Sequence, residues 1–147
     1  MESEKTIEVV KCYMSICNSY RVQESSTLEL VSDDVYWLDP RFPPFRGKDQ
    51  AAQYFQYAGL ENLVMRVVWE AKNIFAAGEE ACVEWYAEAT LGIKFSVEGS
   101  SVFRIKEGKI YYYRGYWDTF IWKSNIAFPL SKSLMSTIAR VGSQWKR

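Results

Sequence analysis

The chain of 147 residues has no histidine, only three cysteines and four prolines, and a formal net charge of zero. Without histidine it lacks the commonest protein metal ligand and the side chain that most readily exchanges protons near neutral pH. Cys12, Cys17 and Cys82 form no CxxC pair, so we expect no metal site and regard the thiols as small buried side chains in a reducing compartment. Any acid–base chemistry must therefore come from carboxylates, tyrosines, cysteines or a lysine.

Charge and hydropathy exclude further classes of protein. Acidic and basic residues balance at 18 each, so nothing indicates attraction to nucleic acid. The N-terminus, Met1–Lys5, is polar and has no apolar run behind it, unlike a signal peptide. No apolar stretch approaches the length of a membrane span. We therefore expect a cytoplasmic protein that does not bind membranes, with one main domain for a chain of this length.

What the chain has in excess is aromatic side chains. Six tryptophans, ten tyrosines and eight phenylalanines make up 16% of the sequence. A content this high predicts either an interior that surrounds an apolar ligand or a large interface. The composition leaves both interpretations open.

The first half of the sequence predicts helices, a short strand and one loop. Apolar residues at Ile7, Val10, Tyr13 (or Met14) and Cys17 predict an amphipathic helix over 4–20. The other elements expected in this half are a short helix over 26–31 capped by Ser25 or Ser26, a turn at Asp33-Asp34, a strand over 35–38, a loop over 40–44, and a helix over 48–57 that Gly59 closes.

The second half predicts a meander of antiparallel strands. Residues 62–76, 80–91, 93–106 and 109–119 are rich in β-branched and aromatic residues and are separated by short turns that contain glycine. Helices followed by such a meander indicate an α+β fold, in which the helices pack on one face of a strongly curved sheet.

The C-terminal extension, residues 121–147, has a different composition. It contains five basic residues and no acidic ones. Apolar residues at helical spacing predict an amphipathic helix near 131–141. We expect this extension to dock on its own domain or on a partner subunit rather than on a membrane surface.

Asp39 is the first candidate for acid–base chemistry. It follows Trp37-Leu38 at the end of the predicted strand and directly precedes Pro40. Apolar surroundings disfavour the charged form of a carboxyl group and so favour proton exchange near neutral pH. An aspartate before a proline also commonly caps a turn. The sequence therefore leaves two interpretations of Asp39, a general base and a turn cap.

The order of these elements, with Asp39-Pro40 followed by Gly47 and a hairpin segment over 103–118, resembles the nuclear-transport-factor-2-like superfamily over residues 5–120. This superfamily includes ketosteroid isomerases, SnoaL-like polyketide cyclases and limonene epoxide hydrolases. The resemblance implies a cystatin-like cone, with helices packed on a curved antiparallel or mixed sheet. It also implies that no cofactor is needed and that the chain forms a homodimer through the outer face of the sheet.

The resemblance to ketosteroid isomerases implies particular catalytic residues. In that family an aspartate before a proline is the general base, which gives this role to Asp39. A tyrosine of the first helix donates a hydrogen bond to the substrate oxyanion, which corresponds to Tyr13. Ser101 stands where the family has a second, acidic donor, and a serine hydroxyl is a weaker donor than a neutral carboxyl group. Phe55 stands where the family has a supporting tyrosine.

The other two families imply different carboxylates. Limonene epoxide hydrolases activate water with an Asp–Arg–Asp arrangement, and the aligned residues here are Glu84, Cys82 and Gly115. Two of these three groups are missing, so the resemblance does not imply that mechanism. SnoaL-like cyclases need one carboxylate that acts as acid and base inside an aromatic cavity. Asp39, Glu84 or Asp118 could meet this requirement.

Alternation along the strands distinguishes these carboxylates. The resemblance places Glu84, Tyr86 and Glu88 on the face that looks into the cone, and Asp118 on the opposite face or at the strand end. Carboxylates on an enclosed face are costly unless a partner, a proton or a ligand cavity compensates them, so Glu84 becomes a catalytic candidate. With the opposite alternation, Glu84 and Glu88 are ordinary solvent-facing residues.

The sequence thus predicts a cofactor-independent isomerase or cyclase that transfers protons on a small apolar carbonyl compound, such as a polyketide-, terpenoid- or steroid-like molecule. The alternative is a non-catalytic module of the same fold that binds a hydrophobic ligand or a protein. The catalytic candidates are Asp39, Tyr13, Ser101 and Glu84. The residues expected to line an aromatic cavity are Trp37, Phe42, Phe55, Trp69, Tyr86, Phe103, Tyr113 and Trp117.

Overall fold

The structure is a computed structural model that describes residues 1–19 and 23–121. The predicted helix near 131–141, and the predicted basic extension beyond Ile121, lie outside the described residues. The helices and strands of the described part are α1 (Glu2–Cys17), α2 (Gln23–Leu30), β1 (Val31–Leu38), β2 (Phe45–Arg46), α3 (Gly47–Val64), β3 (Val68–Ala77), β4 (Glu80–Leu91), β5 (Ile93–Lys106) and β6 (Lys109–Trp117).

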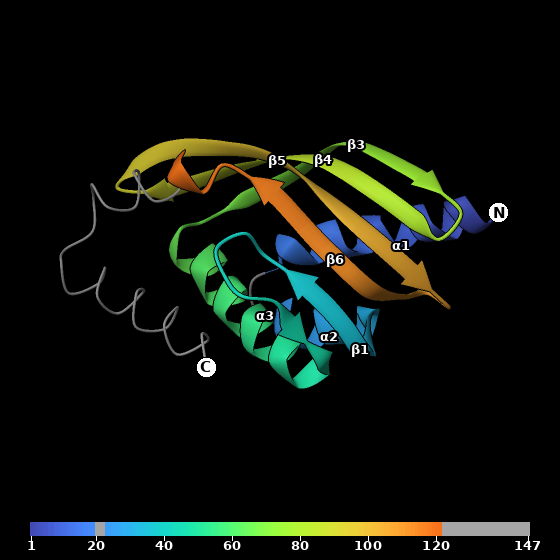
Figure 1. The fold of residues 1–147 in the computed structure, drawn as a ribbon. Coiled ribbons are helices and arrows are strands. Elements are labelled where there is room, and N and C mark those ends of the chain that lie inside the picture. The colour runs from blue at the N-terminus through green and yellow to red at the C-terminus, as the bar shows by residue number, and fades with distance from the viewer. Residues whose placement is uncertain (20–22, 122–147) are drawn as a thin grey trace.

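These strands form one curved sheet that carries the helices on one face (Figure 1). The strand order is β2-β1-β6-β5-β4-β3. β1 pairs in parallel with β6, and every other neighbouring pair is antiparallel. α1 packs against β3 and β4, whereas α3 packs against β1 and α2. This arrangement confirms the predicted α+β fold with helices on a strongly curved, mixed sheet.

α1 follows the sequence pattern closely. Val10, Tyr13, Met14 and Cys17 are all buried, as the apolar repeat predicted, because they share the face that packs on the sheet. The helix ends three residues earlier than expected, at Cys17. α2 begins at Gln23, so the two serines expected to cap it lie inside the helix, and that prediction was wrong.

β1 is longer than predicted. It begins at Val31, so Asp33 and Asp34 belong to the strand and not to a turn before it. Both aspartates are exposed, and the pairing of β1 with β6 shifts its register between Val31 and Tyr36. The two polar residues therefore mark an irregularity within the strand, where five steps along β1, from Val31 to Tyr36, oppose only two along β6, from Ile110 to Tyr112. The loop expected over 40–44 is confirmed.

α3 is also longer than predicted. The helix runs from Gly47 to Val64, and Gly59, which was expected to close it, is a buried residue in its interior. Buried residues continue at helical spacing through Ala58 and Asn62, so packing of this face outweighs the cost of about 1 kcal/mol for a glycine inside a helix. The extra turn carries Glu61 and Asn62.

The predicted orientation of β4 was wrong. Val83 pairs with Ser101 and Trp85 with Gly99, and directly opposed residues of antiparallel strands share a face. Because Ser101 faces the interior, Val83 and Trp85 do so as well, and Glu84 and its neighbours of the same parity point outward. This alternation buries apolar side chains and leaves the carboxylate of Glu84 exposed, which avoids the cost of enclosing a charge.

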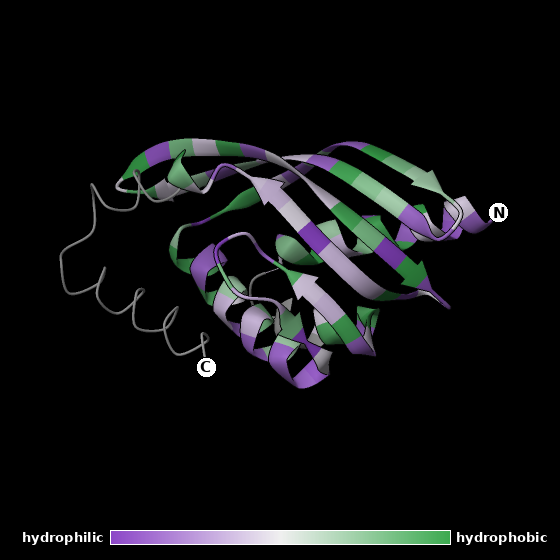
Figure 2. Ribbon diagram, viewed as in Figure 1, coloured by the Kyte–Doolittle hydropathy of each residue, from purple (hydrophilic) through white to green (hydrophobic). Residues whose placement is uncertain are grey.

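The inward faces of β5 and β6 were predicted correctly. Val97, Ser101, Phe103, Tyr113 and Gly115 are all buried. Figure 2 shows hydrophilic and hydrophobic residues alternating along β5, as expected for a strand with one face on the core. The interior of the cone is therefore formed by alternate residues of these strands and by the buried faces of the helices.

Candidate active site

The cone encloses a cavity of about 50 Å³ between the sheet and the helices α1 and α3. Its walls are mainly aromatic and aliphatic, but three charged side chains also reach it. The lining residues are Tyr13, Met14, Cys17, Asp39, Arg41, Tyr54, Phe55, Ala58, Glu61, Asn62, Trp69, Trp85, Ala87, Val97, Ser101, Tyr113 and Trp117.

Asp39 lies directly after β1 and is 6% exposed. Its Oδ1 accepts a hydrogen bond of 2.9 Å from the backbone N–H of Arg41, which turns the chain after Pro40. The carboxylate also lines the cavity. Asp39 therefore caps the turn after β1 and also lines the cavity.

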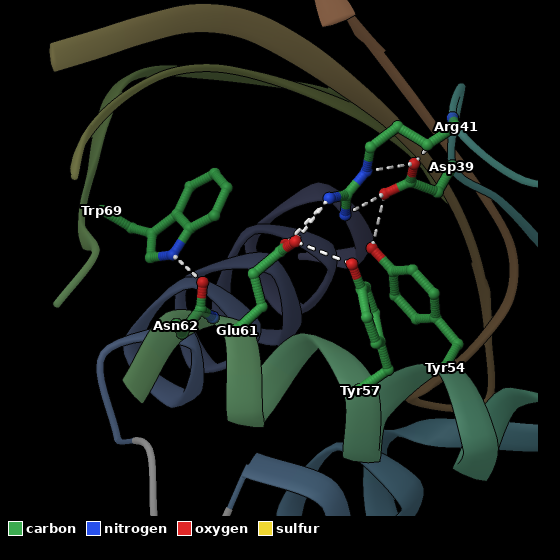
Figure 3. Close-up of polar contacts among 7 residues, drawn as sticks. All are labelled: Asp39, Arg41, Tyr54, Tyr57, Glu61, Asn62 and Trp69. Atoms are coloured by element: carbon green, nitrogen blue, oxygen red, sulfur yellow. Dashed lines mark hydrogen bonds and ion pairs between the residues drawn. The ribbon is translucent and has the colours of Figure 1, made fainter. Parts of the chain in front are cut away.

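Arg41 lies between two carboxylates, as Figure 3 shows. Its Nε donates to Asp39 Oδ1 at 3.1 Å, and a terminal nitrogen donates to Asp39 Oδ2 at 3.3 Å. The other terminal nitrogen donates to both oxygens of Glu61, at 2.9 and 2.8 Å. All three side chains are largely buried, with 11%, 5% and 11% of Arg41, Asp39 and Glu61 exposed. The result is a continuous acid–arginine–acid array.

Two tyrosines of α3 complete this array (Figure 3). The Tyr54 hydroxyl donates to Asp39 Oδ2 at 2.8 Å, and the Tyr57 hydroxyl donates to Glu61 Oε2 at 2.9 Å. Burial raises the pKa of both phenols, and the adjacent carboxylates raise it further. Both tyrosines therefore remain protonated donors.

Arg41 is also enclosed by aromatic rings. Its guanidinium carbon lies 5.1 Å from the ring centres of Phe42 and Trp117. Burial lowers the pKa of Arg41, but the Glu61 and Asp39 carboxylates raise it by more, so this pKa lies well above its ordinary value. The guanidinium therefore stays charged. The expected apolar surroundings of Asp39 are thus wrong, because the largely buried guanidinium of Arg41 contacts its carboxylate.

A second, uncharged polar group lies on the sheet side of the cavity. Trp85 Nε1 donates to Ser101 Oγ at 2.9 Å, and Ser101 Oγ lies 3.0 Å from the Tyr113 hydroxyl, where either can be the donor. The indole reaches Ser101 because it lies across Gly99, where a Cβ would meet the Trp85 ring at 2.6 Å. The absence of a side chain at Gly99 thus shapes this wall.

Tyr13 also lines the cavity and is 8% exposed. Its ring contacts Trp37, Phe103 and Tyr113 edge-on or tilted, with ring centres 5.4 to 5.8 Å apart. Burial raises the pKa of Tyr13 well above its ordinary value, and its contact with Cys17 adds to this effect. The hydroxyl is therefore a neutral donor at the cavity wall.

The structure brings most of the residues expected at the site to one cavity, but not all of them. Those that line it are Asp39, Tyr13, Ser101, Phe55, Trp69, Tyr113 and Trp117. Trp37, Phe42 and Phe103 lie behind this wall, where Trp37 stacks on Tyr113 at 3.9 Å. Their expected place in the cavity lining was therefore wrong.

Glu84 and Tyr86 lie on the outer face of the sheet, so their expected place in the cavity was wrong. The Glu84 carboxylate accepts a hydrogen bond of 2.7 Å from Asn73 on the neighbouring strand, and Tyr86 contacts Glu88. Asp118, which was expected on the opposite face or at the strand end, is exposed directly after β6 and accepts a hydrogen bond from the Phe120 N–H at 2.9 Å.

The sequence patterns did not indicate the remaining polar and aromatic residues of the site, which are Arg41, Tyr54, Tyr57, Glu61, Asn62 and Trp85. Tyr54, Tyr57 and Glu61 are spaced three and four residues apart, which places them on one helical face. That signal was hidden because the helix was expected to close at Gly59. The strand positions that align with the Asp–Arg–Asp arrangement of limonene epoxide hydrolases do not carry such an arrangement here. The acid–arginine–acid array is formed instead by Asp39 and Arg41 after β1 and by Glu61 of α3.

No group of three or more Cys, Asp and Glu side chains within residues 1–19 and 23–121 could hold a metal ion. Helices long and apolar enough to cross a membrane are likewise missing from the described part of the chain.

The curved sheet, with the helices on one face and a cavity between them, defines a cystatin-like α+β cone. Residues 10–113 match the model of the SnoaL-like domain family. Since this match covers more than half of the chain, the protein belongs to the SnoaL-like domain family. No curated protein shows significant sequence similarity to it.

Solved structures of low sequence identity share this fold. A protein assigned as a SnoaL-like polyketide cyclase from Jannaschia sp. CCS1 is 13% identical, with a TM-score of 0.75 over 88% of this chain and 96% of that one. An LEH-like epoxide hydrolase from M. tuberculosis is 17% identical, with a TM-score of 0.68 over 95% and 99%. The epoxide hydrolase/cyclase-like enzyme SalBIII, which acts in pyran ring formation in salinomycin, is 22% identical, with a TM-score of 0.69 over 82% and 96%.

Proposed function

We propose that this protein is a cofactor-independent isomerase or cyclase that transfers a proton on a small carbonyl compound bound in the aromatic cavity. The observation that carries this proposal is the buried acid–arginine–acid array of Asp39, Arg41 and Glu61 at the cavity wall. Membership of the SnoaL-like family, and the likeness in fold to cyclase and epoxide hydrolase-like proteins, supports the same class of reaction.

Glu61 is the better placed of the two carboxylates to exchange a proton with a substrate. Asp39 accepts hydrogen bonds from three nitrogen atoms of Arg41 and from Tyr54, so each of its oxygens has two donors. Glu61 accepts from one nitrogen of Arg41 and from Tyr57. A carboxylate has about four acceptor positions, so Glu61 retains capacity that Asp39 lacks. In this mechanism Asp39 and Arg41 orient Glu61, which is the general base.

The neutral hydroxyl groups supply the complementary function. Abstraction of a proton next to a carbonyl group places negative charge on its oxygen, and aligned donors stabilise that charge. Tyr13, Ser101 and Tyr113 line the same cavity as Glu61. We assign them the role of donors to the substrate oxygen, while the aromatic walls exclude water and hold the apolar part of the substrate.

A second candidate function is binding without catalysis. The cavity of about 50 Å³ is far smaller than the roughly 300–1,000 Å³ of ordinary ligand sites. Its polar groups bond mainly to one another. These two observations favour a module that holds a very small ligand, or one whose interior is filled by its own side chains.

Deuterium exchange separates these two functions without knowledge of the substrate. A panel of small ketones and aldehydes is incubated with the protein in D₂O, and NMR follows replacement of the protons next to the carbonyl group. An enzyme of the proposed class accelerates exchange in at least one compound, and Asp39→Asn slows that exchange by disturbing Arg41. Compounds that bind without accelerated exchange would support the binding module instead.

A further inference from the structure

The cavity carries an excess of negative charge. Among the residues that the structure describes, its charged lining side chains are Asp39, Arg41 and Glu61, which are two carboxylates and one guanidinium. The nearby tyrosines add no charge, because burial and the carboxylates raise the pKa of Tyr54 and Tyr57. Within residues 1–19 and 23–121, the lining of the cavity therefore holds one more acidic than basic side chain.

This excess is concentrated at Glu61. Asp39 has four donors from Arg41 and Tyr54, whereas Glu61 shares one Arg41 nitrogen between its two oxygens and has one further donor, Tyr57. An ionised carboxylate with unused acceptor positions in a largely buried site is stabilised by any further donor, and most by a charged one.

Aromatic rings flank the same space. Hydrogen bonds fix both the backbone and the indole of Trp69. The Asn18 side chain donates to the Trp69 carbonyl at 2.9 Å and accepts from the Trp69 N–H at 2.8 Å, and Trp69 Nε1 donates to Asn62 at 3.3 Å. Asn62 follows Glu61 on α3, and Figure 3 shows the Trp69 indole directed to that end of the helix. The ring centres of Trp69 and Trp85 are 5.0 Å apart, and both rings line the cavity.

A negative charge beside fixed aromatic rings is the arrangement that attracts organic cations, because the face of an aromatic ring is also electron-rich. The wall formed by Trp117 is already occupied by Arg41, which lies 5.1 Å from its ring centre. The unused acceptor position of Glu61 and the rings of Trp69 and Trp85 could therefore accommodate a second cation beside Arg41.

We propose that the cavity binds the ammonium group of a small amine, whose N⁺–H groups donate to Glu61 and whose alkyl groups contact Trp69 and Trp85. The volume of about 50 Å³ suits an ammonium group with few substituents. This inference goes beyond the proposed catalysis, because binding of an amine is measured without turnover and a protein that binds amines without catalysis also satisfies it.

The test compares amines with neutral molecules of similar shape. Binding of methylammonium and trimethylammonium is measured by calorimetry and by thermal unfolding, with ethanol and tert-butanol as the neutral counterparts and sodium chloride at constant ionic strength. We expect the ammonium ions to bind at least tenfold more tightly than the alcohols. Failure of the wild-type protein to bind any of these ammonium ions, or equal binding of the alcohols, overturns the proposal.

Two variants assign the effect to the cavity. Glu61→Gln should reduce ammonium affinity at least tenfold, whereas Glu84→Gln, the same chemical change on the outer face, should leave it unchanged. Trp69→Leu keeps an apolar wall and should weaken ammonium binding more than alcohol binding. Equal effects of Glu61→Gln and Glu84→Gln would show that the cations bind elsewhere on the surface and would refute the assigned site.

Discussion

Replacement of Arg41 by methionine should destabilise the fold strongly. The substitution keeps an unbranched side chain but removes the cation that both Asp39 and Glu61 contact at 3.3 Å or less. All three side chains are at most 11% exposed, so solvent cannot replace the lost partner. Leaving a buried charge without its partner costs about 3–5 kcal/mol, and we expect a loss of this size in the free energy of unfolding at pH 7.

Arg104→Met is the matched control. Arg104 also donates to a carboxylate, Glu80 Oε1, at 3.0 Å, but the two side chains are 48% and 65% exposed. Exposed ion pairs contribute about 0–1 kcal/mol, so urea unfolding should show at most a change of this size. Equal losses in the two variants at pH 7 would refute the account of the buried array.

Three further outcomes follow from the interior of the cone. Gly99→Ala should destabilise the protein by about 1–3 kcal/mol in urea unfolding, because the new Cβ lies 2.6 Å from the Trp85 ring and from a backbone oxygen. Tyr54→Phe should cost about 1.5–3 kcal/mol in the same assay, since it removes a hydrogen bond of 2.8 Å to the charged Asp39. Burial raises the pKa of Cys17 from 9.0 to about 12, so the unfolded thiol ionises first and unfolding free energy should fall between these pH values. Cys17→Ala should make that fall shallower.

Much of the fold could be predicted because its signals are local. The apolar repeat of α1 buries Val10, Tyr13, Met14 and Cys17, and the alternation of β5 places Ser101 and its neighbours inside. In both cases one face of a regular element packs on the core, so the spacing of apolar residues in the sequence predicts which side chains are buried. The inclusion of Asp39, Tyr13 and Ser101 in one cavity also followed from the resemblance.

The sequence did not indicate the acid–arginine–acid array, because the array depends on tertiary packing. Gly59 has the local preference of a helix end, yet the buried face of α3 carries the helix on to Glu61. The orientation of β4 depends on which of its residues pairs with Ser101. A shift of this pairing by one residue would turn the Glu84 side chain inward and the Trp85 side chain outward. Arg41 lies in a loop without periodicity, so only the structure shows that its guanidinium turns back onto Asp39.

The most direct test of the central claim is the rate of deuterium exchange next to a carbonyl group in the Glu61→Gln variant. If Glu61 is the general base, exchange in an accepted compound should fall by about 100-fold or more, which is the usual contribution of such a group. Glu84→Gln, which changes an exposed carboxylate on the outer face, should retain the wild-type rate. A Glu61→Gln protein that is folded and exchanges protons as fast as the wild type would contradict the account.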